Sequence, residues 1–167
     1  MLIGHLPAGY LASRRPLRRV GMPERARLTA ITLVASVAPD LDLLYFYGVD
    51  RSVHHHALFL HWPSFWLAFA VAFGVLGLGS GRPFWGAAAG FGGGAALLHL
   101  ALDSVAGSVR WLAPFSDHET TLVTIPPGPH GWIWSFVTHW TFGVELAICL
   151  AAGWVWSTAR RRASRDA

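Results

Sequence analysis

The sequence predicts an all-α protein: a polytopic helical membrane protein with four transmembrane helices and a short N-terminal re-entrant or interfacial helix. We expect a single integral membrane domain over residues 1–167. Of these residues 53% are hydrophobic and only 13% are charged, which is too apolar for an ordinary soluble domain. Long apolar runs, joined by short polar connections, support the same class.

The N-terminal segment is apolar but short. Residues 1–13 are interrupted by Pro7 and Gly9, and they are too few to cross a bilayer as a helix. We therefore expect a re-entrant or interfacial segment there. No positive charge precedes it, which argues against a cleaved signal peptide.

Four longer apolar runs follow. The predicted spans cover residues of about 28–47, 63–79, 84–102 and 132–156. Pro39 lies in the first of them, and because proline lacks a backbone donor the helix is predicted to kink or loosen near residues 35–39. Glycines in the third run allow close contact between helices.

The basic residues predict the orientation. All thirteen are arginine, with six in residues 14–27, one at Arg82 and four in a basic tail, residues 157–167. The positive-inside tendency places these eleven in the cytoplasm, with Arg51 and Arg110 as exceptions. We therefore expect a multi-pass protein of a bacterial-type inner membrane with a cytoplasmic C-terminus, and no nucleic-acid partner. The single Cys149 excludes an intrachain disulfide.

Two carboxylates, Asp40 and Asp42, stand beside Pro39 in an apolar run. A charge in that setting is costly and often functional. Residues two apart on a regular helix point to nearly opposite sides, so both reach one cation only if the helix is distorted. A helix cap at the water boundary and a cation ligand are equal alternatives for these two residues alone.

The histidines add further candidate ligands. His99 and Asp103 are four apart on one helix face and can hold one metal, although a histidine bonded to its helix partner is the alternative. His56 and His61 are expected to flank a turn where a loop enters the next helix. His55 is more typical of a solvated loop residue and is kept as a possible additional ligand.

Under the predicted topology these polar residues all fall toward the outer end of the bundle. His139, two turns into the last span, and Glu145, deeper still, are possible additional site residues. Each of the two needs a partner, because an unpaired polar group is costly in the membrane.

A mixed set of imidazoles and carboxylates suits zinc, manganese or iron, and six or more ligands suit two ions better than one. The sequence contains no GxSxG motif and no glycine-rich phosphate loop followed by Lys. A metal-activated water is the only nucleophile it proposes. The candidates on this reasoning are Asp40, Asp42, His56, His61, His99 and Asp103.

Several motifs follow one another from His5 to Glu145. They are His5 before a Gly-containing helix, Pro39-Asp40-Leu41-Asp42, the His-x4-His element of His56 and His61, His99-Leu100-Ala101-Leu102-Asp103, Gly107, and Leu112-Ala113-Pro114-Phe115. In this order they resemble the membrane-bound metal-dependent hydrolases of YdjM type. The resemblance implies an inner-membrane protein with a distant similarity to zinc-dependent phospholipase C. It also implies a metal site at His5, Asp40, Asp42, His56, His61, His99 and Asp103.

The chain departs from the family pattern inside the His-x4-His element. Many members have Arg and Gly after the first His and Thr before the second, where this chain has Ala57, Leu58 and Leu60. The departure affects a hydrogen bond behind the ligands and any substrate contact made by threonine, rather than the ligands themselves.

We therefore expect a membrane-embedded hydrolase with one or two divalent ions, zinc first and manganese or iron as alternatives. Asp40 or Asp42 would act as catalytic base, and a lipid or other phosphoester would be the substrate. The alternatives are a non-enzymatic metal or proton carrier, and a haem protein ligated by His61, His99 or His139. The metal hypothesis requires the ligating atoms of Asp40, His61 and His99 to lie within about 5 Å of one another.

Overall fold

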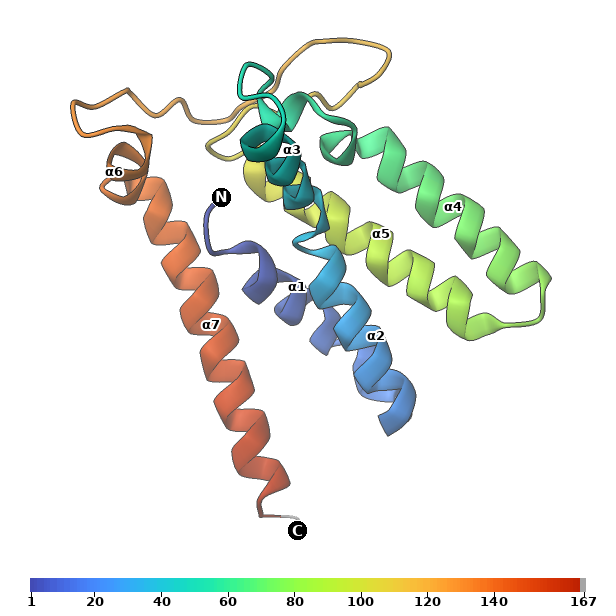
Figure 1. Ribbon diagram of the computed structural model, residues 1–167. Coiled ribbons are helices and arrows are strands. Elements are labelled where there is room, and N and C mark those ends of the chain that lie inside the picture. Colours follow the sequence, from blue (N-terminus) through green and yellow to red (C-terminus); the bar gives the residue numbers. More distant parts are fainter. Residues whose placement is uncertain (166–167) are drawn as a thin grey trace.

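The computed structural model describes residues 1–165, and these form a bundle of helices (Figure 1). Residues 166 and 167 of the predicted basic tail lie outside the described residues. The helices are α1 His5–Arg14, η1 Pro16–Arg19, α2 Met22–Ala35, η2 Ala38–Leu41, α3 Asp42–Gly48, η3 His55–Ala57, η4 Phe59–His61, α4 Pro63–Gly79, α5 Pro83–Asp103, α6 Trp132–Val137 and α7 Trp140–Ala163. The predicted all-α class is confirmed.

Helix α5 lies at the centre of the bundle and contacts α1, α2 and α4 (Figure 1). Its small residues bring α4 close: a Cβ atom added at Gly93 would lie 2.5 Å from the Cβ of Ala70. A Cβ at Gly77 of α4 would lie 2.6 Å from the backbone nitrogen of Gly86. Since real Cβ atoms do not approach so closely, these glycines are required by the packing, as the sequence predicts.

Two helices, α5 and α7, are long and apolar enough to cross a membrane. Helix α2 and the following η2–α3 segment form a bent pair, with a bend of 48°, which counts as a third candidate if it is one span. Helix α4 is apolar but shorter, with 17 residues. The described chain therefore has two to three candidate spans by length and composition, where the sequence analysis predicts four.

The break in the first apolar run lies where Pro39 predicts it. Helix α2 ends at Ala35, and Pro39 lies in the first turn of η2. The connection contains hydrogen bonds between residues three apart, as in a 3₁₀-helix. The backbone nitrogen of Val37 donates to the carbonyl oxygen of Val34, and that of Asp40 donates to the carbonyl oxygen of Val37, both at 3.2 Å. The predicted loosening is confirmed, and it separates the aspartates from α2.

The last predicted span, 132–156, is not a single helix. Helix α6 ends at Val137, and α7 begins at Trp140 after an extended His139 with a ψ of 148°. The ring of His139 accepts a hydrogen bond from the backbone nitrogen of Thr141 and so caps α7. His139 therefore starts the long helix, whereas the sequence analysis places it two turns inside a span.

Helix α1 does not lie apart from the bundle but packs against α2, α5 and α7 (Figure 1). Its ten residues rise only about 15 Å, half of a hydrocarbon core. A packed position of this kind fits the re-entrant alternative. The start of α2 and the end of α7, two segments that contain arginines, lie in the lower part of Figure 1, and the α4–α5 turn lies at its right, while the carboxyl end of α5 lies in the upper part.

We expect Gly93→Leu to destabilise the bundle by about 1–3 kcal/mol, because the new side chain must push α4 away from α5. Gly94→Leu is the matched control, since a Cβ at Gly94 meets nothing within 4 Å. Thermal unfolding of both variants in detergent measures the difference. Equal midpoints would contradict the close packing of α4 on α5.

Candidate functional site

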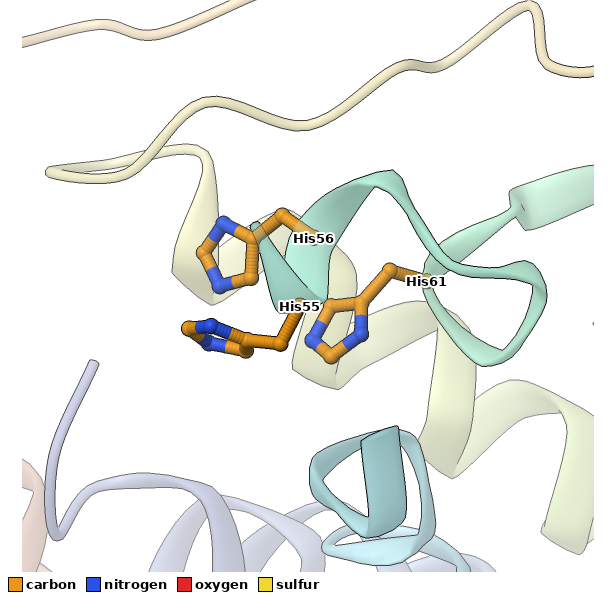
Figure 2. Close-up of side chains that lie close together, drawn as sticks. All are labelled: His55, His56 and His61. Carbon is orange, nitrogen blue, oxygen red and sulfur yellow. The ribbon is translucent and has the colours of Figure 1, made fainter. Parts of the chain in front are cut away.

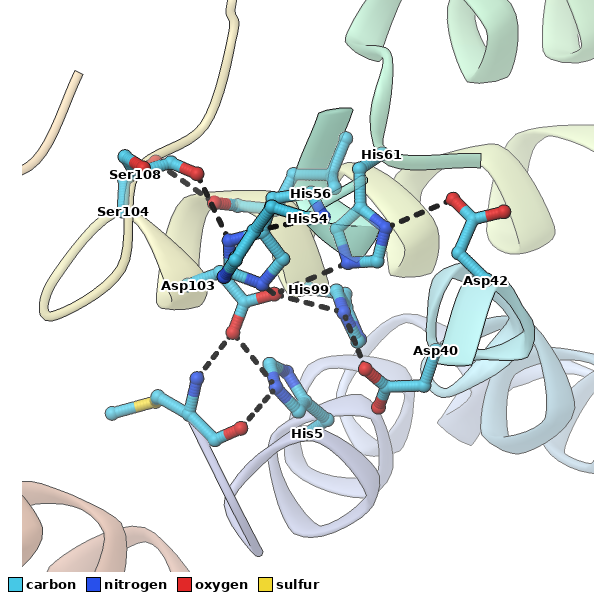
Figure 3. A network of polar contacts seen from close by, with 12 residues as sticks. His5, Asp40, Asp42, His54, His56, His61, His99, Asp103, Ser104 and Ser108 are labelled. Atoms are coloured by element: carbon cyan, nitrogen blue, oxygen red, sulfur yellow. Dashed lines mark hydrogen bonds and ion pairs between the residues drawn. The ribbon is translucent and has the colours of Figure 1, made fainter. Parts of the chain in front are cut away.

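Seven polar side chains from six short segments converge at the carboxyl end of α5 (Figure 3). They are His5 of α1, Asp40 of η2, Asp42 of α3, His56 of η3, His61 of η4, and His99 and Asp103 of α5. This is the set that the family resemblance implies.

Three groups within this region have ligand atoms that all lie within 4.8 Å of one another. The groups are His55, His56 and His61; His5, His99 and Asp103; and Asp40, His61 and His99. His61 and His99 each belong to two groups, so the three form one continuous cluster. The third group meets the distance that the metal hypothesis requires.

The carboxylate of Asp103 is at the centre of the cluster. Its Oδ2 atom lies 3.0 Å from Nε2 of His99, 3.6 Å from Nε2 of His56 and 3.7 Å from Nε2 of His61. Its Oδ1 atom lies 3.1 Å from Nε2 of His5 and also contacts the Met1 amino group. Asp103 is 1% exposed, so these contacts are screened little by water.

In His99, His56 and His61, the hydrogen bond made by Nδ1 fixes the tautomer of the ring. Nδ1 of His99 lies 2.9 Å from the carbonyl oxygen of Ser36, and Nδ1 of His56 lies 2.9 Å from that of Ser108. A carbonyl only accepts, so both Nδ1 atoms donate. Nδ1 of His61 in the same way donates to Oδ2 of Asp42 at 3.1 Å.

The Nε2 atoms of His99, His56 and His61 therefore direct lone pairs toward one carboxylate oxygen. Within residues 1–165, the buried Nε2 atoms of His61 and His99 and the Oδ2 atom of Asp103 have no hydrogen-bond partner. Electron-rich atoms that face one another at 3.0–3.7 Å require a shared cation, either a proton or a metal ion.

Asp42 lies behind His61 rather than among the converging atoms. It belongs to none of the three groups, and its carboxylate accepts a hydrogen bond from Nδ1 of His61. Burial lowers the pKa of His61, but the carboxylates of Asp103 and Asp42 outweigh this and raise it. Asp42 thus stabilises positive charge on or near the ring, as carboxylates behind metal-binding histidines do.

Asp40 is the most accessible carboxylate of the cluster. Its Oδ1 atom lies 3.6 Å from Nε2 of His99, and its side chain is 34% exposed. Both aspartates follow the break after α2, with Asp40 in η2 and Asp42 at the start of α3, and they contact different histidines (Figure 3). The distortion predicted from Pro39 therefore places them in different roles rather than on one atom.

The loop histidines form the outer part of the cluster (Figure 2). The rings of His55 and His61 pack edge to face, with centroids 5.3 Å apart. Burial lowers the pKa of His55 to about 4 and that of His56 to about 3, so both rings are neutral near pH 7 and can act as ligands. His55, predicted only as a possible additional ligand, belongs to one of the three groups.

His5 reaches the cluster because α1 is held in the bundle. Its ring stacks on that of His99 with centroids 3.7 Å apart. Nε2 of His5 lies 3.1 Å from the carbonyl oxygen of Met1, so it carries the proton, and the buried Nδ1 has no partner among the described residues. A Cβ at Gly9 would lie 2.7 Å from the Cβ of Ser36, which shows how closely α1 approaches the end of α2.

Glu145 of α7 anchors the segment that carries His5. It is fully buried, and its carboxylate accepts hydrogen bonds from the backbone nitrogens of Leu2 at 2.7 Å, Ile3 at 2.5 Å and Gly4 at 3.0 Å. Glu145 is therefore not a member of the metal-binding groups. Glu145 accepts from backbone amides just before α1 that have no acceptor within the helix. The sequence alone does not reveal this role.

His139 lies at the start of α7, where Nδ1 contacts the hydroxyl of Thr141 at 3.0 Å, and it belongs to none of the three groups. The sequence analysis also misses the carbonyl groups of Ser36 and Ser108, because any residue type offers a carbonyl. The Gly107 motif is one available signal: a Cβ there would lie 2.9 Å from the His56 ring.

We expect Glu145→Ala to free the N-terminal segment, because three backbone donors lose their acceptor at a cost of about 1–3 kcal/mol or more. Amide hydrogen exchange of residues 2–5 should rise strongly. Glu24→Ala, at an exposed glutamate of α2, is the control. Unchanged exchange in Glu145→Ala would refute the anchoring role.

Comparisons with known proteins place the chain in a family. The family model described as YdjM inner membrane protein matches residues 1–163. No curated protein and no solved structure matches the chain. The match covers every residue of the cluster and nearly all of the sequence, and the chain belongs to the YdjM inner membrane protein family.

Proposed function

We propose that the chain is a membrane-embedded hydrolase that holds one or two divalent cations at the Asp103 cluster. The observation that carries this proposal is the convergence of three Nε2 atoms on one buried carboxylate oxygen. Among the described residues, no hydrogen-bond donor reaches the buried Nε2 atoms of His61 and His99 or the Oδ2 atom of Asp103. A metal ion compensates such a set of atoms better than a proton, because several can bind it at once.

The donor types favour zinc, since imidazole nitrogen and carboxylate oxygen are common zinc ligands, and manganese or iron also accept them. We assign His5, Asp40, His56, His61, His99 and Asp103 as ligands, with His55 as an outer one. Asp42 is better suited to orienting His61 than to binding metal, because it contacts Nδ1.

A bound divalent cation would supply an acidified water and polarise a phosphoryl or carbonyl oxygen. Asp40 suits the role of general base because its carboxylate is the most accessible one. In phosphodiester hydrolysis the water oxygen would bond to phosphorus while its proton passes to a carboxylate oxygen of Asp40. The bond from phosphorus to the leaving ester oxygen would then break, and that oxygen would take the proton back from Asp40. The buried Asp103 would hold the histidines in place throughout.

The membrane setting favours a lipid or another amphiphilic phosphoester as substrate. We propose four spans, formed by α2 with η2–α3, by α4, by α5 and by α7, with the arginine-rich end and the C-terminus in the cytoplasm and the cluster toward the outer face. A metal or proton carrier needs polar groups along the whole path. Below the cluster, the residues that α5 buries are small and apolar, from Ala88 to Ala96, which favours a site open to one side.

We expect Asp42→Asn to weaken zinc binding roughly 10–100-fold, because the amide oxygen still accepts from His61 but carries no charge. Competition with a chelator of known affinity measures the change, and Asp117→Asn, at an exposed carboxylate outside the cluster, is the control. Unchanged affinity would remove Asp42 from the site. Loss of one whole equivalent of zinc would make Asp42 a ligand, as the sequence analysis predicts.

The function itself is tested on detergent-purified protein with a fluorogenic phosphodiester lipid. We expect about one or two zinc ions per chain by elemental analysis, and hydrolysis that a chelator abolishes and zinc restores. Asp40→Ala should slow hydrolysis by about 100-fold or more, and His99→Ala should lose metal as well. His118→Ala, at an exposed histidine, should change neither.

Three results would decide against the proposal. Equal metal content in wild type and His99→Ala would remove the ligand assignment. Metal bound without hydrolysis of any phosphodiester lipid would favour the carrier. A haem absorption spectrum of the purified protein would favour the cytochrome-like alternative.

A further inference from the structure

A second feature lies away from the Asp103 cluster, in an apolar groove that α2, α4 and α5 enclose. It has a volume of about 810 Å³, which is in the range of ligand pockets. Ile31 and Val34 of α2 line one wall, and Phe69, Phe73 and Leu76 of α4 line the other.

The floor of the groove consists of small residues of α5, namely Ala88, Ala89 and Gly92. A Cβ at Gly92 would meet only Ile31 and Ala35, at 3.6 and 3.9 Å. The groove is therefore deep because the residues of its floor have small side chains or none. Along α4 the lining runs from Trp66 to Ser80, a rise of about 21 Å. That is about two thirds of a hydrocarbon core.

A second hollow adjoins the groove at the arginine-rich end. This hollow has a volume of about 710 Å³ and includes Glu24, Arg27 and Arg82 in its lining. Arg82 and Trp85 line both spaces, so the two are adjacent. Within residues 1–165, neither Arg27 nor Arg82 forms an ion pair. Two guanidinium groups against one carboxylate leave the hollow positively charged.

We propose that the groove and the hollow together bind one anionic phospholipid, with its phosphate at Arg27 and Arg82 and an acyl chain between α2 and α4. Basic pockets between membrane helices bind anionic head groups, and arginine matches phosphate geometry. The lining of the groove is apolar except for Ser80 and Arg82 at this end. An amphiphile with one charged end and a long apolar tail fits that distribution. With the proposed topology, the lipid belongs to the cytoplasmic leaflet.

A second copy of the chain fits this surface less well. Helix α7 is the most exposed apolar helix, but its last turn carries Arg160, Arg161 and Arg162. Two copies in one membrane have the same orientation, so this turn would face Arg27 and Arg82 at the same depth. Like charges would then repel, whereas a phosphate is attracted.

The first test needs no variant. The full-length protein, with chelator present so that metal chemistry plays no part, is titrated with long-chain phosphatidylglycerol, long-chain phosphatidylcholine, six-carbon phosphatidylglycerol or inorganic phosphate. Native mass spectrometry counts bound lipid, and thermal unfolding reports stabilisation. We expect one tightly bound long-chain phosphatidylglycerol, with about tenfold preference or more over phosphatidylcholine. The short-chain lipid and phosphate should stabilise little.

Variants then separate the two ends. Arg27→Gln with Arg82→Gln should remove the preference for the anionic lipid, while Arg162→Gln, at an exposed arginine, should keep it. Ala89→Phe should fill the groove and weaken both long-chain lipids, and Val75→Phe, on the outer face of α4, is the control.

Equal binding of the two long-chain lipids to wild type would overturn the proposal. So would stabilisation by phosphate equal to that by the long-chain lipid, which would indicate an anion site without a tail. A dimer that excludes lipid would assign the groove to a second copy. The comparison of long-chain with six-carbon phosphatidylglycerol uses only the wild-type protein. Poor folding of Ala89→Phe would therefore not affect this outcome.

Discussion

The fold brings the lone pairs of three histidine nitrogens toward one carboxylate oxygen of Asp103, and the cluster depends on balancing the resulting repulsion. The carbonyl oxygens of Ser36 and Ser108 and the carboxylate of Asp42 each accept a hydrogen bond from Nδ1 of a histidine, and they thereby turn three Nε2 lone pairs toward Oδ2 of Asp103. The arrangement is stable only with positive charge between these atoms. The helices that deliver the rings must resist that repulsion, and the glycine-mediated packing of α4 on α5 and the anchored α1 hold these helices together.

The break at Pro39 has a chemical consequence as well as a structural one. A continuous helix would have carried Asp40 and Asp42 on opposite sides, with one of them facing lipid. The 48° bend turns both toward the carboxyl end of α5 but at different histidines. Asp40 stays partly exposed beside His99, while the buried Asp42 is bonded to His61. Two carboxylates two residues apart thus acquire distinct environments.

Much of this could be predicted from the sequence, and the limits have physical causes. The helical class, the break at Pro39 and the convergence of His56, His61, His99 and Asp103 follow from local patterns and from the family resemblance. Whether Asp42 binds metal or orients His61 depends on the direction of a ring, which spacing does not encode. Glu145 shows the same limit: its partners are backbone nitrogens about 140 residues away in the sequence. The start of α7 was missed because His139 caps a helix through its own side chain, inside a run that is apolar on both sides.

The two ends of the bundle show how charge is divided in this chain. At one end, acids and imidazoles are buried together, each tied to a partner from another element. At the other end, arginines lie around a hollow that opens onto apolar walls. Between them α5 buries small apolar residues, among them Ala88, Ala89, Ala95 and Ala96. This apolar layer separates the charged ends, so a cation at the cluster and an anion at the arginines do not compete for the same side chains. The fold can therefore hold both without either weakening the other.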